Sequence, residues 1–462
     1  MEPRPRDLRA DRLSSANAGS ETGRAIVIAP HLKRVSARAG APRSEAATRS
    51  PQARLEEAIG LARAIDLNVV ESGLVTLNVV RPATYVGKGK VDEIAGLAKS
   101  LEAGIVVMDC ALSPVQQRNL EKAWSAKVVD RTGLILEIFG RRARTREGAL
   151  QVEHAHLTYQ KSRLVRSWTH LERQRGGFGF LGGPGETQIE TDRRLIEERL
   201  ARIDAELEKV KRTRKLHRDS RKRVPYPIVA LVGYTNAGKS TLFNRMTQAT
   251  VLSADMLFAT LDPTLRALDL PHGAHIILSD TVGFISDLPT MLVVAFRATL
   301  EEVIEADVIL HVRDMSHEDA QAQSHDVEQV LGELGIEAGK DERLIEVWNK
   351  IDRLDAEGRL RLFNLAERQD AERRPVLVSA LSGEGLERLT AAIEERIART
   401  RLTLDLALDP ADGAGLSWLY RHAEVLTKEM REDGRLAVTV RADPAKVERI
   451  RAKFGISVKA EN

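Results

Sequence analysis

The chain is poor in cysteine, in aromatic residues and in long apolar runs, and each scarcity excludes a class of protein. One cysteine, Cys110, among 462 residues rules out a disulfide framework and is typical of a reducing compartment. No apolar run approaches the roughly 18 residues of a membrane span. The N-terminus lacks the apolar stretch of a secretory signal, and acids among its arginines argue against a transit peptide. We therefore expect a cytoplasmic protein with no membrane span and at most peripheral contact with a membrane.

The stretch from Tyr226 to Thr241 carries the clearest chemical motif. An apolar run at 228–232 predicts a buried strand, and GYTNAGKS at 233–240 fits the P-loop pattern G-x-x-x-x-G-K-[ST] ahead of a predicted helix. Such a loop points backbone N–H groups at phosphates, and the helix adds the positive end of its dipole. We expect Lys239 to reach the β- and γ-phosphates and Ser240 to bind Mg²⁺. The predicted nucleotide-binding residues here are Gly233, Tyr234, Thr235, Asn236, Ala237, Gly238, Lys239, Ser240 and Thr241.

The tetrapeptide NKID at 349–352, after an apolar strand predicted at 344–348, indicates the base. The carboxylate of Asp352 can accept hydrogen bonds from guanine N1–H and N2–H₂, a donor pair that adenine lacks. A site built around this acceptor rejects the wrong base, because the carboxylate would stay unpaired. Another strand ends at 378–381, where the Ala380 amide is expected to meet guanine O6. The predicted base-site residues are Asn349, Lys350, Asp352, Ser379, Ala380 and Leu381.

The segment between these motifs is expected to contact the γ-phosphate. In P-loop enzymes, an acidic residue at the end of a strand holds Mg²⁺. Here that residue is expected to be Asp280, which would act through water, and Gly283 is expected to turn its amide to the γ-phosphate. Thr260 is the expected second protein ligand of Mg²⁺ in a mobile switch segment, with Thr264 as a competing candidate. The catalytic roles are therefore assigned to Lys239, Gly283 and Thr260. The nucleotide-site residues after the strand are Asp280, Thr281, Val282 and Gly283.

Residues 25–140 alternate between strand and helix patterns. Strands are predicted at 25–28, 70–80 with a break at Gly73, 105–108 and 127–130, and helices at 55–65, 90–101 and 114–124. This alternation predicts a small α/β domain with a mostly parallel sheet. Its loop YVGKGK at 85–90 has two readings: a basic contact to phosphate or RNA, or a tight turn with solvated lysines.

Residues 150–210 show two apolar seams at heptad spacing, which predict an antiparallel helical hairpin within one chain and favour a monomer. The loop between the seams, at 175–186, contains six glycines. Exposed apolar residues at such a tip suggest insertion into a partner. The predicted RNA-binding residues of the tip are Arg175, Gly176, Gly177, Phe178, Gly179, Phe180 and Leu181.

Charge on this hairpin indicates the partner. Residues 141–223 contain 22 lysines and arginines against 12 acids, a net charge of +10 in a chain whose net charge is only +3. Such asymmetry points to a polyanion, and aromatics among glycine and arginine suit stacking on unpaired RNA bases. The alternative is a solvated coiled-coil face laced with salt bridges.

The predicted architecture is α/β throughout, with a P-loop GTPase domain between smaller units. The expected divisions are a disordered tail at 1–24, an α/β domain at 25–140, the basic hairpin at 141–223, the GTPase domain at 224–400 and a small α/β domain at 401–462. In the last unit we expect a helix at 416–430, a strand at 435–440, a helix at 443–453 and a strand at 456–458.

Over about residues 55–400 the chain resembles the HflX family of GTPases. The motifs that carry the resemblance are the P-loop, FATLDPT at 258–264, DTVGF at 280–284, NKID at 349–352 and, above all, RGGFGFLGGPGETQIETDRR at 175–194. The resemblance implies a cytoplasmic GTPase that binds the large ribosomal subunit, with the hairpin tip near the rRNA of the peptidyl-transferase centre. It also implies splitting or rescue of stalled or idle ribosomes under stress.

Two residues bear on catalysis. Phe284 stands where many GTPases have a glutamine that orients water, so slow hydrolysis is expected without a partner. In related translation GTPases the residue matching Asn236 supports a monovalent cation, which implies a role for K⁺ here. Two other functions stay open: a GTPase acting in ribosome assembly or tRNA modification, and an RNA-remodelling protein that also uses ATP through its N-terminal domain.

Overall fold

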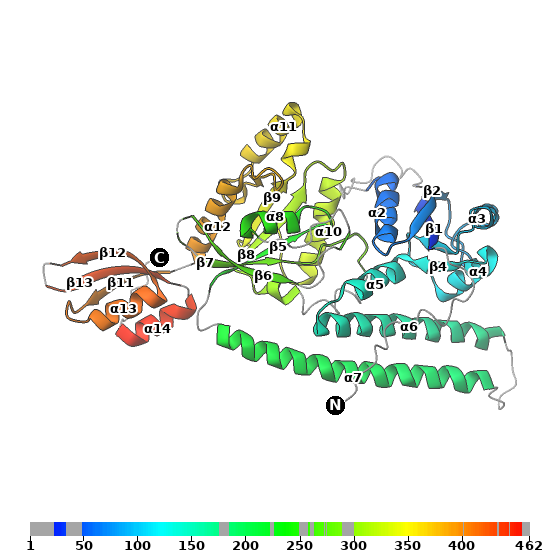
Figure 1. The fold of residues 1–462 in the computed structure, drawn as a ribbon, viewed down its shortest axis with the longest axis horizontal. Coiled ribbons are helices and arrows are strands. Elements are labelled where there is room, and N and C mark those ends of the chain that lie inside the picture. Colours follow the sequence, from blue (N-terminus) through cyan, green and yellow to red (C-terminus); the bar gives the residue numbers. More distant parts are fainter. Residues whose placement is uncertain are drawn as a thin grey trace, which may run out of the picture.

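The computed structural model describes residues 23–33, 49–174, 184–221, 226–248, 257–258, 263–271, 273, 275–288, 300–400, 402–431, 434–442 and 444–454. Three sheets, each with its own helices, follow one another along the longest axis of the molecule (Figure 1). Two long helices, α6 and α7, lie beneath the N-terminal and central sheets. Across these described ranges, no helix combines the length and apolarity needed to cross a membrane.

The N-terminal domain is a parallel α/β sheet, as the alternating pattern predicted. Its elements are β1 (Arg24–Leu32), α2 (Pro51–Arg63), β2 (Asn68–Leu77), α3 (Lys88–Ser100), β3 (Ile105–Met108), α4 (Pro114–Trp124), β4 (Lys127–Asp130) and α5 (Arg131–Arg142). The strand order is β2-β1-β3-β4 and every pairing is parallel. Helices α3 and α4 bury their apolar residues on one face of the sheet, and α2 and α5 bury theirs on the other.

Local signals account for most of these boundaries. Ser113 caps α4 by accepting a hydrogen bond from the Gln116 N–H, with Pro114 in the first turn, as expected. The expected break at Gly73 is wrong: Gly73 pairs with Ile28 inside a continuous β2. Helix α5 was not predicted, because Asp130 ends β4 and caps the next helix at once.

Helices α6 (Arg146–Gln174) and α7 (Pro184–Arg221) form the predicted hairpin. Leu150 and Ile203 are buried on the two seams. Two polar seam positions are filled by contacts between the helices. The His154 ring lies 3.2 Å from the Asp204 carboxylate, and Lys161 forms an ion pair with Glu197 at 3.1 Å. The predicted loop at 175–186 is shorter than expected, because α7 already begins at Pro184.

The central domain has a six-stranded sheet in the order β10-β9-β8-β5-β7-β6, parallel except for β6. Its elements are β5 (Ile228–Gly233), α8 (Lys239–Thr247), β6 (Thr264–Asp269), β7 (His275–Asp280), β8 (Val308–Asp314), α10 (Ala320–Glu333), β9 (Leu344–Asn349), α11 (Ala356–Glu367), β10 (Val376–Leu377) and α12 (Leu386–Thr400). Strands β5, β7 and β9 are parallel, so the motifs that follow them meet at one edge of the sheet.

The C-terminal sheet differs from the prediction. Its elements are β11 (Leu402–Leu408), α13 (Gly413–His422), β12 (Glu424–Met430), β13 (Leu436–Ala442) and α14 (Pro444–Phe454), with strand order β11-β13-β12. The helix predicted at 416–430 is wrong in its second half, because 424–430 pairs antiparallel with β13. Strand β11 was missed, and the strand predicted at 456–458 lies outside the described residues.

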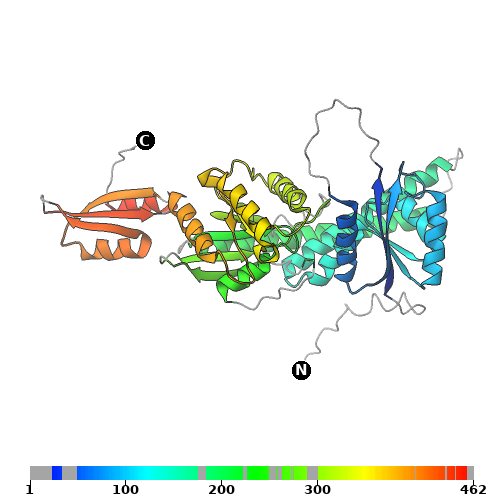
Figure 2. The ribbon, with the colours of Figure 1, turned by 90° about the horizontal axis from the view of Figure 1, so that it is seen from above.

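One apolar core joins the N-terminal and central domains. It includes Leu61 of α2 and Phe139 of α5, and from the central domain Val232, Phe258 and Phe284. Figure 2 shows α2 on the side of the N-terminal sheet that faces the central domain. The residues around the P-loop therefore pack against a second domain.

Candidate functional site

The P-loop runs from the end of β5 into α8 and needs glycine at two positions. Gly238 has φ +94°, and a Cβ built there would lie 2.3 Å from the Asn349 side-chain nitrogen. A Cβ at Gly233, where φ is +152°, would lie 2.2 Å from the Val312 carbonyl oxygen. Any side chain would collide at both positions, so the motif glycines allow the loop to close.

Lys239 lies inside the loop, 6% exposed. Its ammonium donates to the carbonyl oxygens of Gly233 at 3.1 Å and Tyr234 at 2.8 Å. Burial lowers the pKa of Lys239 to about 8, against the opposing attraction of the Asp280 carboxylate. A buried cation that donates to backbone carbonyl oxygens suits a site for phosphate oxygens.

Ser240 and Asp280 meet at the start of α8. The Ser240 hydroxyl donates to the Asp280 carboxylate at 2.7 Å, and Asp280 is completely buried at the end of β7. A hydroxyl beside a carboxylate is the all-oxygen donor set that Mg²⁺ prefers. Thr281, the residue after Asp280, donates its hydroxyl to the Leu231 carbonyl oxygen at 2.5 Å. This hydrogen bond connects the segment after β7 to β5.

The NKID motif is joined to the P-loop by hydrogen bonds. The Asn349 side chain donates to the Ala237 carbonyl oxygen at 2.8 Å and accepts from the Ala380 N–H at 3.0 Å. Lys350 pairs with Asp314 at the end of β8, at 2.7 Å. The predicted base residues therefore lie around one place, at the carboxyl ends of β9 and β10. Leu381, the last of them, is 73% exposed.

The segment after β7 lies directly on the P-loop. The Thr235 N–H donates to the Phe284 carbonyl oxygen at 2.8 Å, and the Phe284 N–H donates to the Gly233 carbonyl oxygen at 3.1 Å. A Cβ built on Gly283 would lie 2.9 Å from Thr235 Cγ2 and 3.0 Å from Lys239 Nζ. The Phe284 ring is buried in the core shared by the two domains, so this side chain cannot orient an attacking water.

Several predicted site residues lie outside the described part of the chain. Thr260 is one, and the hairpin tip at 175–181 is another. The competing Thr264 begins β6, where its backbone pairs with Asp280. The structure therefore brings together Lys239, Ser240 and the residues of DTVGF and NKID, and it leaves Thr260 and the tip as predictions.

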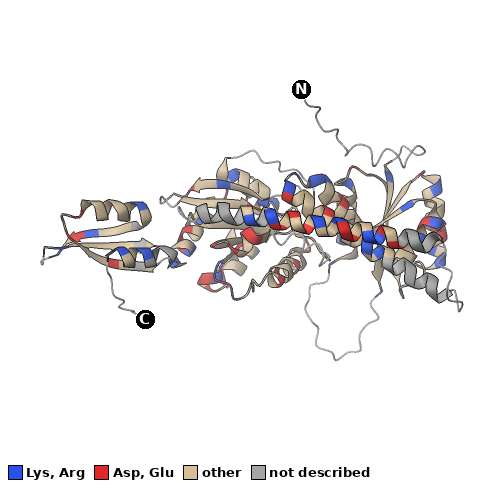
Figure 3. Ribbon diagram, turned by 90° about the horizontal axis from the view of Figure 1, so that it is seen from below, with Lys and Arg blue, Asp and Glu red and all other residues tan. Residues whose placement is uncertain are grey.

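Charge is unevenly distributed along the hairpin. Residues 190–208 carry four arginines against seven acids, and Figure 3 shows both signs alternating there. Arg199 pairs with Glu153 at 2.8 Å and Arg146 with Glu206 at 3.1 Å, so this stretch matches the solvated, salt-bridged alternative. Residues 209–223 instead carry nine lysines and arginines against one acid. The excess charge suited to a polyanion thus gathers at the C-terminal end of the hairpin.

Sequence reasoning missed the polar contacts between the P-loop and the N-terminal domain. Tyr234 donates its hydroxyl to Glu57 of α2, a residue 177 positions earlier in the chain. Arg131 at the start of α5 donates to the backbone oxygen of Ser286, beyond DTVGF, at 2.9 Å. The one sequence feature that could have indicated these contacts is the tyrosine at an unspecified position of the P-loop pattern. The neighbouring sequence does not identify its partner, which lies 177 residues away.

Family models match almost the whole chain. Residues 52–140 match "GTP-binding GTPase N-terminal", 142–221 "GTP-binding GTPase Middle Region", 228–350 "50S ribosome-binding GTPase" and 364–462 "HflX C-terminal domain". The resemblance expected over residues 55–400 therefore extends through the C-terminal sheet.

The chain is also similar over most of its length to bacterial GTPases. It is 52% identical to GTPase HflX of Magnetococcus marinus over 382 residues, covering 82% of this chain and 86% of that protein. It is 48% identical to GTPase HflX of Escherichia coli over 362 residues, covering 78% and 83%. Among solved structures, a GTP-binding protein from Sulfolobus solfataricus in complex with GDP is 22% identical with a TM-score of 0.43, covering 81% of this chain and 99% of that one.

Proposed function

The chain belongs to the HflX family of GTPases and hydrolyses GTP, and we propose that it binds the large ribosomal subunit and separates stalled or idle ribosomes, with a role under stress. The observation that carries the proposal is the match of residues 228–350 to a model described as a 50S ribosome-binding GTPase. The basic end of the hairpin supports it, since nine cations within 209–223 suit rRNA phosphates. The tip at 175–181 would then contact rRNA near the peptidyl-transferase centre.

In the proposed nucleotide site, each residue acts through position and charge. Lys239 binds the β- and γ-phosphates from inside the loop, where burial strengthens its attraction for them. Asp352 accepts from guanine, and Ala380 donates its amide to guanine O6. Mg²⁺, which P-loop GTPases typically use, supplies charge neutralisation, and Ser240 and Thr260 would hold it, with Asp280 acting through water.

The switch segments link this chemistry to binding. GTP would order the segments that contain Thr260 and Gly283, and the ordered domain would fix the hairpin for docking on rRNA. Because the ring of Phe284 is buried, hydrolysis by the isolated chain should be slow, and the ribosome should complete the site.

The test is GTP hydrolysis with and without purified large ribosomal subunits at several salt concentrations, with small subunits as the control. Stimulation by large subunits alone, falling steeply with salt, is the expected result. A Lys209→Gln/Arg212→Gln double variant should lower the salt slope of binding by about two, roughly one for each phosphate contact. The matched control is Arg194→Gln/Arg202→Gln, whose arginines pair with Glu198 in the salt-bridged stretch at 190–208.

The absence of stimulation at every salt concentration would count against the ribosome as partner. Transfer RNA and precursor rRNA would be tested next in the same assay. Equal salt slopes for the two double variants would contradict the proposed contact of residues 209–223 with rRNA phosphates.

A further inference from the structure

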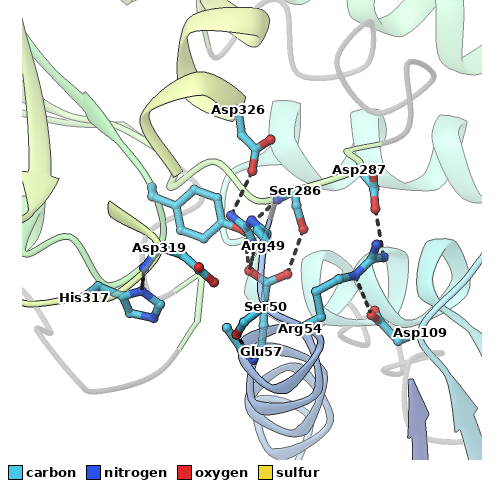
Figure 4. Close-up of polar contacts among 12 residues, drawn as sticks. Arg49, Ser50, Arg54, Glu57, Asp109, Ser286, Asp287, His317, Asp319 and Asp326 are labelled. Carbon is cyan, nitrogen blue, oxygen red and sulfur yellow. Dashed lines mark hydrogen bonds and ion pairs between the residues drawn. The ribbon is translucent and has the colours of Figure 1, made fainter. Parts of the chain in front are cut away.

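The P-loop residue Tyr234 connects the nucleotide site to the N-terminal domain. Its hydroxyl donates to Glu57 of α2 and accepts a hydrogen bond of 2.7 Å from the N–H of Ser286. The Ser286 hydroxyl in turn donates to Glu57 at 3.0 Å. Figure 4 shows Glu57 of α2 and Ser286 converging at this point. One tyrosine therefore joins the P-loop, α2 and the segment that follows DTVGF.

Arg131 holds the same segment from a second helix of the N-terminal domain. Its guanidinium donates to Glu57 at 2.5 Å and to both the carbonyl and the hydroxyl oxygen of Ser286 at 2.9 Å. It also pairs with Asp109 at the end of β3. We call the whole group the interdomain cluster: Arg49, Arg54, Glu57, Asp109, Arg131, Tyr234, Ser286, Asp287 and Asp326.

The centre of the interdomain cluster is buried. Arg131 is 4% exposed, and Glu57 accepts hydrogen bonds from Arg49, Arg131, Tyr234 and Ser286. Burial alone would raise the pKa of Glu57, but Arg131 and Arg49 outweigh it and hold that pKa at about 2. Glu57 is therefore a carboxylate at neutral pH, and removing its charge would leave a buried cation with one partner fewer.

The interdomain cluster holds the segment that contains Gly283 closely against the P-loop, beside the expected position of the γ-phosphate. A γ-phosphate must accept from both the Lys239 ammonium and the Gly283 N–H, at roughly 2.8 Å from each donor. In this structure a mere Cβ on Gly283 would lie 3.0 Å from Lys239 Nζ and 3.0 Å from Thr235 Cα. The hydrogen bonds of Phe284 to Gly233 and Thr235 close the same side of the loop.

The N-terminal domain also contacts the other segment that flanks the nucleotide site. Phe258, at the start of FATLDPT, packs edge-on against Phe139 of α5, with ring centroids 4.7 Å apart. A Cβ built on Gly60 of α2 would lie 3.0 Å from Leu257 Cδ1. The helices that hold Ser286 therefore also contact Leu257 and Phe258, which shortly precede the predicted switch residue Thr260.

We propose that Glu57 is a positioning residue for GTP binding, acting from outside the GTPase domain. With Arg131 it holds Ser286, and through it Gly283 and Phe284, against the P-loop, which excludes the γ-phosphate of GTP and not the two phosphates of GDP. GTP binds only when the segment from Gly283 to Ser286 moves away from the P-loop. The apparent affinity for GTP is therefore the intrinsic affinity multiplied by the fraction of molecules in which the segment has moved. This inference goes beyond the ribosome proposal and rests only on the GTPase activity.

The test compares the affinity of the full chain for fluorescent GDP and for a fluorescent β,γ-imido analogue of GTP, both with excess Mg²⁺. Glu57→Gln removes the charge that holds Arg131 and Ser286, so affinity for the GTP analogue should rise about tenfold, the size expected for a hydrogen bond to a charged group. The GDP affinity should stay within about twofold. The informative quantity is the ratio of the two affinities, because partial unfolding lowers the binding-competent fraction equally for both nucleotides.

The matched control is Glu56→Gln, the same change on the adjacent, exposed residue of α2. Its affinity ratio should equal that of the parent chain. If Glu57→Gln fails to fold, the same affinity ratio is measured for Ser286→Ala and should change in the same direction. This variant removes only the hydroxyl that contacts Glu57 and Arg131 and leaves the backbone unchanged. An unchanged ratio, or a shift toward GDP, in the folded variant overturns the proposal. Neither outcome depends on whether large ribosomal subunits stimulate the enzyme.

Discussion

The Asp352 carboxylate accepts a hydrogen bond of 2.6 Å from the Ser379 hydroxyl. The same hydroxyl oxygen accepts a hydrogen bond of 3.1 Å from the Ser382 N–H. Ser379 therefore fixes the orientation of Asp352 from the loop after β10. A carboxylate that is already oriented loses less entropy on meeting guanine, so base selection should depend on this one acceptor.

Asp352→Asn should change the preferred base from guanine to xanthine. The new amide donates to the oxygen at C2 of xanthine, and it cannot accept two hydrogen bonds from guanine. Loss of a hydrogen bond to a charged group costs about 1.5–3 kcal/mol, so GTP affinity should fall roughly tenfold to a hundredfold. Competition between GTP and XTP measures the change. Unchanged guanine selectivity would remove Asp352 from the base site.

Lys239→Ala should abolish nucleotide binding without unfolding the hairpin. The ammonium donates to the carbonyl oxygens of Gly233 and Tyr234 at 3.1 and 2.8 Å, and these residues belong to the end of β5 and the P-loop rather than to α6 or α7. Titration with fluorescent GTP measures binding, and far-ultraviolet circular dichroism measures helix content. The control is Lys340→Ala, whose lysine is exposed and pairs with Glu337. Normal GTP affinity in the Lys239 variant would refute its assignment.

Nucleotide affinity should be nearly constant below pH 8 and weaken above it. Burial lowers the pKa of Lys239 to about 8, and phosphate binding requires the charged form. Below that pKa the lysine is already charged, whereas above it binding must take up a proton. The dissociation constant should therefore rise about tenfold from pH 7 to pH 9. Lys239→Arg stays charged throughout, so any affinity it retains should not vary over this range. A flat profile for the parent chain would contradict the lowered pKa.

GTP hydrolysis should be faster in potassium than in sodium if Asn236 supports a monovalent cation. Asn236 has φ +60°, so Asn236→Gly removes the side-chain oxygen while keeping a backbone that glycine tolerates. This variant should hydrolyse GTP equally in the two buffers. Steady-state phosphate release at equal ionic strength is the measurement. Equal rates for the parent chain in the two buffers would count against the cation.

Much of the fold could be predicted because its signals are local. Ser113 and Pro114 mark the start of α4, and the glycines of the P-loop mark the turn between β5 and α8. Pairing with distant strands explains the errors. Residues 424–430 have a helix-like composition, yet they form β12 because β13 offers them backbone partners.

The sequence by itself determined which residues we predict to meet the nucleotide, since GYTNAGKS, DTVGF and NKID each follow a strand whose parallel neighbours end at one edge. The tertiary structure decided what holds that site. Tyr234 and Ser286 meet Glu57, which lies 177 and 229 residues away in the chain, and no periodicity connects these positions. The reason is physical: a local motif specifies its own backbone, whereas buried charges from separate domains become partners only when those domains pack.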